Sequence, residues 1–103
     1  MNKYRNIPTI IDGVKFASRK EARRYQELKL LERAGAISEL ELQPKYDLTI
    51  NGVKIGRYIG DFKYREGVCG KYILEDVKGI RTPIYKMKAK LVKALHGVEI
   101  LET

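Results

Sequence analysis

A stretch with the two-residue periodicity of β-strands, residues 37–78, lies between two segments with helical periodicity. The apolar residues of its first part share one parity and predict a single strand over 37–50: Leu40, Leu42, Tyr46, Leu48 and Ile50. Pro44 interrupts that strand and predicts an edge position or a bulge. A turn at Asn51–Gly52 and a loop over 66–70 then predict strands over 53–64, bent at Gly56 or Gly60, and over 72–78.

Both flanking segments carry helix-boundary signals. The first helix is expected to begin after Ser18, with Glu21 at capping-box spacing, and to end before Gly35. The second is expected to begin after Thr82, which a proline follows, and to end at Gly97. The residues expected to form the buried stripes are Ala22, Tyr25, Leu28 and Leu31 on the first helix and Ile84, Met87, Leu91 and Leu95 on the second.

Asp12–Gly13, between apolar flanks, predicts an N-terminal β-hairpin, and residues 98–101 predict a last short strand. After the hairpin the expected order is therefore α-β-β-β-α-β, an α/β (α+β) fold. A length of 103 residues allows one domain, with the hairpin in 1–17 and the core in 18–103.

Net charge, cysteine content and the length of apolar runs limit the classes of function that this chain can have. Twenty-one basic and 13 acidic residues give a formal net charge of +8, which favours a polyanionic partner such as nucleic acid. One cysteine, Cys69, excludes an internal disulfide and a cysteine-rich zinc site. No apolar run reaches the roughly 20 residues of a membrane helix, and the N-terminus lacks a secretory signal, so the cytoplasm is the expected compartment.

Two aspartates stand where strand patterns disfavour them. If the loop between the second and third predicted strands is symmetric, Asp61 lies directly opposite Asp76. Lys78 shares a face with Asp76, whereas Glu75 and Val77 point the other way.

Facing carboxylates repel each other unless a cation or a proton lies between them. Oxygen ligands suit magnesium or manganese, and a nearby lysine can hold or deprotonate a water, which together favour metal-assisted phosphodiester hydrolysis. The alternative is structural: Asp61 and Lys78 form a cross-strand ion pair, Asp76 is solvated, and Glu21 completes a capping box.

The pair Asp61 and Asp76–Val77–Lys78 resembles the PD-(D/E)XK signature of restriction-endonuclease-like nucleases, and the expected element order is similar to the core of that superfamily. Four segments in order, 16–25, 42–46, 60–64 and 75–79, resemble a small phage and prophage family of proposed endonucleases, long labelled a domain of unknown function. The resemblance covers nearly the whole chain.

By position, the resemblance implies that Asp61 is the first metal-binding acid and that Asp76 is the second, with the Val77 carbonyl as a further ligand. It implies that Lys78 orients the attacking water and stabilises negative charge. It makes Glu21 an extra acid that acts through a metal-bound water.

Two departures bear on these roles. Gly60 replaces the proline of the signature, which should not affect metal ligation, and the second acid is an aspartate, one methylene shorter than the commoner glutamate. Glu75 rivals Asp76 as the second acid if the strand bulges. The residues expected to contact nucleic acid are Arg19, Lys20, Arg23 and Arg24 on the first helix and, by resemblance, Tyr85 and Lys88 on the second.

The resemblance implies a Mg²⁺-dependent DNA endonuclease, with Mn²⁺ as a substitute, that leaves 5′-phosphate and 3′-hydroxyl ends. Similarity to phage junction-resolving enzymes implies a double-stranded or branched DNA substrate and the cytoplasm of a bacterial host. A homodimer, with the N-terminal hairpin as its candidate interface, would let two sites cut two strands. The alternatives are a non-catalytic DNA-binding protein on the same fold and an RNA-directed nuclease.

Overall fold

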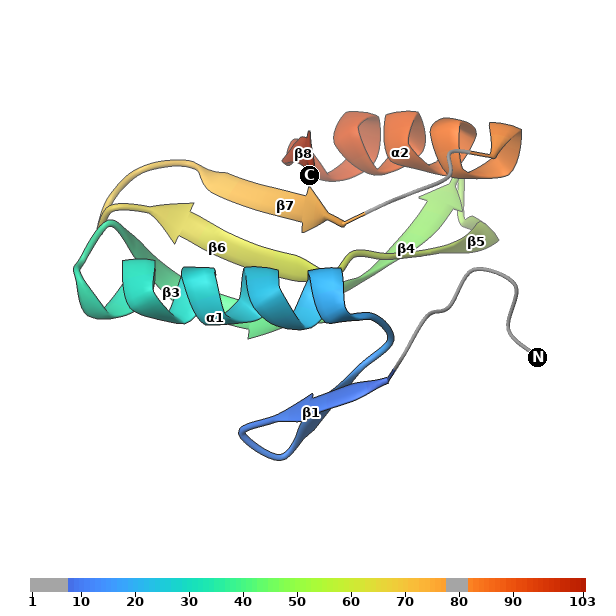
Figure 1. The fold of residues 1–103 in the computed structure, drawn as a ribbon. Helices are drawn as coiled ribbons and strands as arrows, with labels where there is room; N and C mark the ends of the chain where they lie inside the picture. Colours follow the sequence, from blue (N-terminus) through green and yellow to red (C-terminus); the bar gives the residue numbers. More distant parts are fainter. Residues whose placement is uncertain (1–7, 78–81) are drawn as a thin grey trace.

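The computed structural model describes residues 8–77 and 82–103 (Figure 1). The fold is mixed α+β, as the sequence predicts. Its elements, in chain order, are β1 (Thr9–Ile11), β2 (Val14–Phe16), α1 (Arg19–Arg33), β3 (Ile37–Leu42), β4 (Lys45–Ile50), β5 (Val53–Ile59), β6 (Phe62–Glu66), β7 (Tyr72–Asp76), α2 (Pro83–His96) and β8 (Glu99–Glu102).

Two tight turns form where the sequence predicts them. Asp12 and Gly13 join β1 to β2 with φ angles of 53° and 76°, and Asn51 and Gly52 join β4 to β5 with φ angles of 50° and 78°. Positive φ at both central residues is the geometry of a two-residue turn whose twist matches the strands.

The two long strands expected over 37–50 and 53–64 are each divided by a bend. β3 gives way to β4 at Gln43–Pro44, and β5 gives way to β6 at Gly60–Asp61. Hydrogen bonds continue across the bend, from the Gln43 N–H to the Asp61 carbonyl (2.9 Å) and from the Gly60 N–H to the Pro44 carbonyl (3.0 Å). The four strands therefore form one bent antiparallel hairpin, and the interruption expected at Pro44 is confirmed.

The bend changes which side of the hairpin is buried. Leu40 and Leu42 pack with the α1 side of the core, whereas Tyr46 and Leu48 pack with the α2 side. The prediction that these residues share one face is therefore wrong. A positive φ of 50° at Gln43, directly before the bend, breaks the alternation of side chains on which that prediction depended.

The main sheet has the order β3-β6-β7-β8, with antiparallel pairing except between β7 and β8, which are parallel. β6 and β7 pair in the register that a symmetric loop predicts, from Phe62 opposite Glu75 to Arg65 opposite Tyr72. The sequence therefore predicts the register of β6 and β7 correctly.

α1 and α2 cover opposite faces of this sheet (Figure 1). Ile73 of β7 packs with α1, and the next residue, Leu74, packs with α2. α1 has the expected Ser18 cap, whose Oγ accepts the Glu21 N–H at 3.2 Å. Its predicted stripe is buried except at the last position, Leu31, which is 37% exposed.

α2 also has its expected ends, with Thr82 as the N-cap and Gly97 in the left-handed conformation at the C-cap. Its predicted buried stripe is wrong: Ile84 and Met87 are more than half exposed and Leu95 is 42% exposed. Val92 is the fully buried residue, and Tyr85, Ala89 and Leu91 pack around it. The side of α2 that carries Tyr85 and Val92 packs against the strands beneath it. Hydrophobic periodicity alone does not predict which side of a helix packs against a sheet.

The described helices include none whose length and apolar character would let it cross a membrane.

Candidate active site at the end of β7

Four elements meet at one end of the main sheet: α1 and β6 begin there, and β7 and β8 end there (Figure 1). The Tyr85 side chain, from the first turn of α2, also reaches this end. The acids expected to bind metal occupy this end. Glu21 lies in the first turn of α1, Asp61 directly precedes β6, and Asp76 is the last residue of β7. Lys78 lies outside the described residues.

Asp61 sits in a local bulge that the sequence did not indicate. Its N–H donates to the Glu75 carbonyl at 3.1 Å, although Phe62 is the residue that pairs with Glu75. Two residues of one strand thus oppose one residue of the other. The Asp61 carboxylate accepts the Val77 N–H at 2.7 Å, which places it at the peptide bond that follows Asp76.

Asp76 is fully buried on the α2 side of the sheet. Its Oδ2 accepts the hydroxyl of Tyr85 at 3.0 Å, and the same hydroxyl lies 3.3 Å from Oε2 of Glu102. Burial, and then the negative charge of Asp76, raise the pKa of Tyr85, so its hydroxyl stays protonated and donates. A residue expected to contact nucleic acid therefore also orients the candidate acid.

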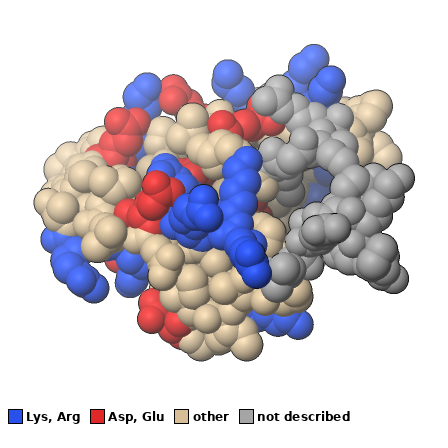
Figure 2. Space-filling model, viewed as in Figure 1, with Lys and Arg blue, Asp and Glu red and all other residues tan. Residues whose placement is uncertain are grey.

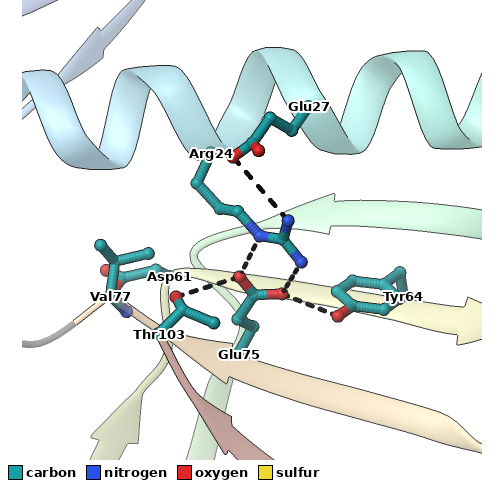
Figure 3. A network of polar contacts seen from close by, with 7 residues as sticks. All are labelled: Arg24, Glu27, Asp61, Tyr64, Glu75, Val77 and Thr103. Carbon is teal, nitrogen blue, oxygen red and sulfur yellow. Dashed lines mark hydrogen bonds and ion pairs between the residues drawn. The ribbon is translucent and has the colours of Figure 1, made fainter.

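Glu75 is equally buried but faces α1 (Figure 3). Arg24 binds it through two nitrogens, with Nη2 at 3.1 Å from Oε2. Tyr64 donates its hydroxyl to Oε2 at 2.7 Å, and Thr103 donates to Oε1 at 3.2 Å. Each carboxylate oxygen is engaged, which is typical of a structural ion pair.

This network argues against the predicted roles of Arg24 and Glu75. Arg24 was expected to contact nucleic acid, but its guanidinium binds Glu75, and its Nη1 also lies 3.8 Å from Glu27. Its hydrogen bond to Glu75 raises its pKa, while burial raises the pKa of Tyr64 to about 12. Glu75 is thus a poor rival for the role of second metal-binding acid, since Arg24 already neutralises it.

Glu21 is buried although it lies in the first turn of a helix. It precedes Arg24 by one helical turn and so lies on the α1 side of the sheet, toward the strand ends. The Ser18 half of the predicted capping box is present, which gives Glu21 a structural role through its backbone.

Basic side chains surround this end on both sides of the sheet. Lys20 and Arg23 of α1 line a pocket of about 330 Å³ with Val77 and Thr103. Figure 2 shows basic side chains gathered over the first half of α1, with acidic ones beside them. On the α2 side, Lys88 and five other residues join Tyr85 in a pocket of about 310 Å³.

One of those residues, Arg57 of β5, was missed by the sequence analysis. No local pattern marks it, because its position depends on the way β5 passes beneath α2. Arg57 lies opposite Asp47 only because the register shifts by one residue between Leu48 and Thr49, whereas the turn at Asn51–Gly52 alone would place Gly56 there.

The donors at this end match a hard divalent cation in kind: carboxylates from Asp61 and Asp76 and the backbone carbonyl of Val77. Within residues 8–77 and 82–103, however, no three Asp, Glu, His or Cys side chains are arranged to hold a metal ion. The expected set of Glu21, Asp61 and Asp76 is therefore not assembled as a three-acid site in this part of the chain.

Comparison with known families gives one match. A family model described as "Protein of unknown function (DUF1064)" matches residues 1–99. The chain belongs to the DUF1064 family. The match spans both helices and the strands β1 to β7, so Glu21, Asp61, Asp76 and Tyr85 lie within the family domain, whereas Glu102 and Thr103 follow it. No curated protein and no solved structure matches the chain.

Proposed function

We propose that this DUF1064 member is a Mg²⁺-dependent DNA endonuclease with a restriction-endonuclease-like core and a preference for branched DNA. The observation that carries the proposal is the meeting of Asp61 with the Asp76–Val77 peptide at the ends of two paired strands. Their spacing in the sequence, with Lys78 two residues after Asp76, is that of the PD-(D/E)XK signature.

Each side chain has a role in this proposal. Asp61, Asp76 and the Val77 carbonyl would hold Mg²⁺ or Mn²⁺, and Tyr85 fixes the orientation of Asp76. A divalent cation bound there supplies Lewis acidity and lowers the pKa of a bound water. Lys78 orients the attacking water and offsets negative charge as the phosphodiester bond is hydrolysed.

The distribution of charge on α1 supports a nucleic-acid substrate. Arg19, Lys20 and Arg23 lie at the start of the helix, where the helix dipole already favours negative charge. Basic residues in that position do not stabilise the helix. A bound phosphate backbone would interact favourably with both the dipole and the side chains, so function accounts for their placement better than stability does.

A non-catalytic DNA-binding protein is the second candidate. The observation that favours it is the lack of an assembled three-acid set within the described residues. The same basic surface would then bind DNA without cutting it. A homodimer joined by the N-terminal hairpin, and a location in the cytoplasm of a bacterial host, stay predictions under either function.

The two candidates are separated by incubating the protein with branched DNA and Mg²⁺. The nuclease gives products with 5′-phosphate and 3′-hydroxyl ends, and Asp76→Ala abolishes cleavage while DNA binding survives. Glu99→Ala, which removes an exposed acid from β8, is the matched control and keeps both activities. Binding without cleavage by the native protein identifies the second candidate. RNA and DNA substrates in competition test the choice of nucleic acid.

A further inference from the structure

The pocket between β5 and α2 has a lining of mixed chemistry. Arg57 and Lys88 contribute positive charge, Ile59 and Ile84 contribute aliphatic surface, and Tyr58 and Tyr85 contribute aromatic rings. Its volume of about 310 Å³ lies at the lower end of the range for small-molecule sites. None of the described residues that line it is acidic.

The two cations reach the pocket from different elements. Lys88 comes from α2, and its Cε lies 3.7 Å from the position that a Cβ on Gly56 would occupy, so its stem passes over β5. Arg57 comes from β5, and its Nε lies 3.6 Å from the exposed carboxylate of Asp47. A phosphate in the pocket can thus be approached from a strand and from a helix at once.

The apolar lining offers surfaces on which a base can stack. Ile59 and Ile84 are 49% and 63% exposed, a large exposure for aliphatic side chains next to a core. The rings of Tyr58 and Tyr85 lie 6.1 Å apart at 33° to each other. Sites that bind unpaired nucleotides commonly combine aromatic rings with basic side chains.

Tyr58 supplies a second observation. Its hydroxyl is buried, and within residues 8–77 and 82–103 it has no hydrogen-bond partner. A buried hydroxyl without a partner is unfavourable, and a ligand that displaces the surrounding side chains and supplies a partner removes that penalty.

Tyr85 connects the pocket to the candidate active site. Its ring lines the pocket, while its hydroxyl contacts Asp76 at 3.0 Å. Anything bound in the pocket therefore lies within one side chain of the acid that is expected to hold the metal.

We propose that this pocket binds one unstacked nucleotide of a nucleic-acid strand, with the base against the aliphatic and aromatic wall and a phosphate between Arg57 and Lys88. The inference rests on the proposed function only in naming DNA as the ligand. It explains a preference for branched DNA, because a nucleotide at a branch point is already unstacked, whereas one in a continuous duplex must first be extruded.

The test measures DNA binding in EDTA, so that it does not depend on cleavage. A splayed-arm DNA and a continuous duplex of the same length are titrated against the intact protein by fluorescence anisotropy. The native protein is expected to bind the splayed-arm DNA at least tenfold more tightly. Equal affinity for the two DNAs overturns the proposal.

The variant Arg57→Ala/Lys88→Ala is compared with Lys86→Ala/Lys90→Ala, which removes the same charge from exposed positions of α2 outside the pocket. The pocket variant is expected to lose about tenfold in affinity for splayed-arm DNA and little for duplex, which abolishes the preference. The control variant is expected to weaken both DNAs equally. If the two variants behave alike, the basic residues act only through general charge and the pocket assignment is wrong.

Tyr58→Phe tests the pocket without removing charge or creating a cavity. The unbound protein is expected to keep its Tm or gain slightly, while the Tm increase caused by splayed-arm DNA becomes smaller than in the native protein. An unchanged increase contradicts the proposed ligand contact. Native protein that shows the preference but does not cleave with Mg²⁺ refutes the nuclease and leaves the pocket assignment in place.

Discussion

Glu75 and Asp76 are neighbours in the sequence and equally buried, yet they lie in different environments. Glu75 faces α1, where Arg24, Tyr64 and Thr103 engage both of its oxygens. Asp76 faces α2, where the Tyr85 hydroxyl binds it, and the Asp61 carboxylate accepts the Val77 N–H that follows it. The difference shows that strand alternation places two adjacent acids in different environments, so the roles proposed for them depend on which face each occupies.

The largest effect expected from this comparison is on cleavage. Asp76→Asn should reduce cleavage of branched DNA by at least about 1,000-fold, equivalent to roughly 4 kcal/mol of transition-state stabilisation. Glu75→Gln should retain cleavage within about tenfold when the protein is folded, because Glu75 does not bind the metal in the proposed site. Initial rates measured on protein verified as folded by circular dichroism test this. An equal loss of cleavage in the two variants would contradict the proposal that Asp76 binds the metal and Glu75 does not.

The α1 face should show the larger effect on stability. Arg24→Ala leaves the buried Glu75 carboxylate without its cation and should lower the free energy of unfolding by about 3–5 kcal/mol. Arg23→Ala removes the neighbouring exposed arginine and should change it by less than about 0.5 kcal/mol. Urea unfolding of the two variants measures the difference, and similar midpoints would mean that the Arg24–Glu75 pair contributes little.

A smaller effect is expected at the bend that positions Asp61. A Cβ on Gly60 would overlap Cδ1 of Leu74, which is fully buried on the α2 side. Gly60→Ala should therefore destabilise the protein by about 1–3 kcal/mol through overpacking. Gly56→Ala is the control, since its Cβ meets Lys88 at an ordinary contact distance of 3.7 Å. Thermal unfolding of both variants tests whether the close approach at Gly60 is specific.

The smallest effect concerns pH. Tyr64 has its pKa raised from 10.0 to about 12, mainly by burial, so the unfolded chain loses this proton at a lower pH than the folded protein does. The stabilisation from protonated Tyr64 is complete below pH 10 and is lost between pH 10 and about 12. Tyr64→Phe should therefore show a shallower fall in stability over that interval. Denaturant midpoints at a series of pH values test this, and parallel curves would contradict it.

The sequence predicted more of the fold than of the site. Ser18, Thr82 and Gly97 marked helix ends correctly because capping depends on atoms within a few residues. The β6–β7 register followed correctly from loop symmetry, but the bulge places Asp61 opposite Glu75 and not, as predicted, directly opposite Asp76. The Arg24–Glu75 pair joins positions 51 residues apart, so no local pattern could have revealed it.

By itself, the sequence determined where both helices begin and end, how the two tight turns form and in which register β6 and β7 pair. Each of these depends on backbone conformation over a few residues. The tertiary structure decided which face of each element is buried: Val92 in place of the Ile84 and Met87 side of α2, and the exchange of faces at Gln43–Pro44. Burial is decided by packing between distant elements, because apolar area is removed from water only where another surface covers it.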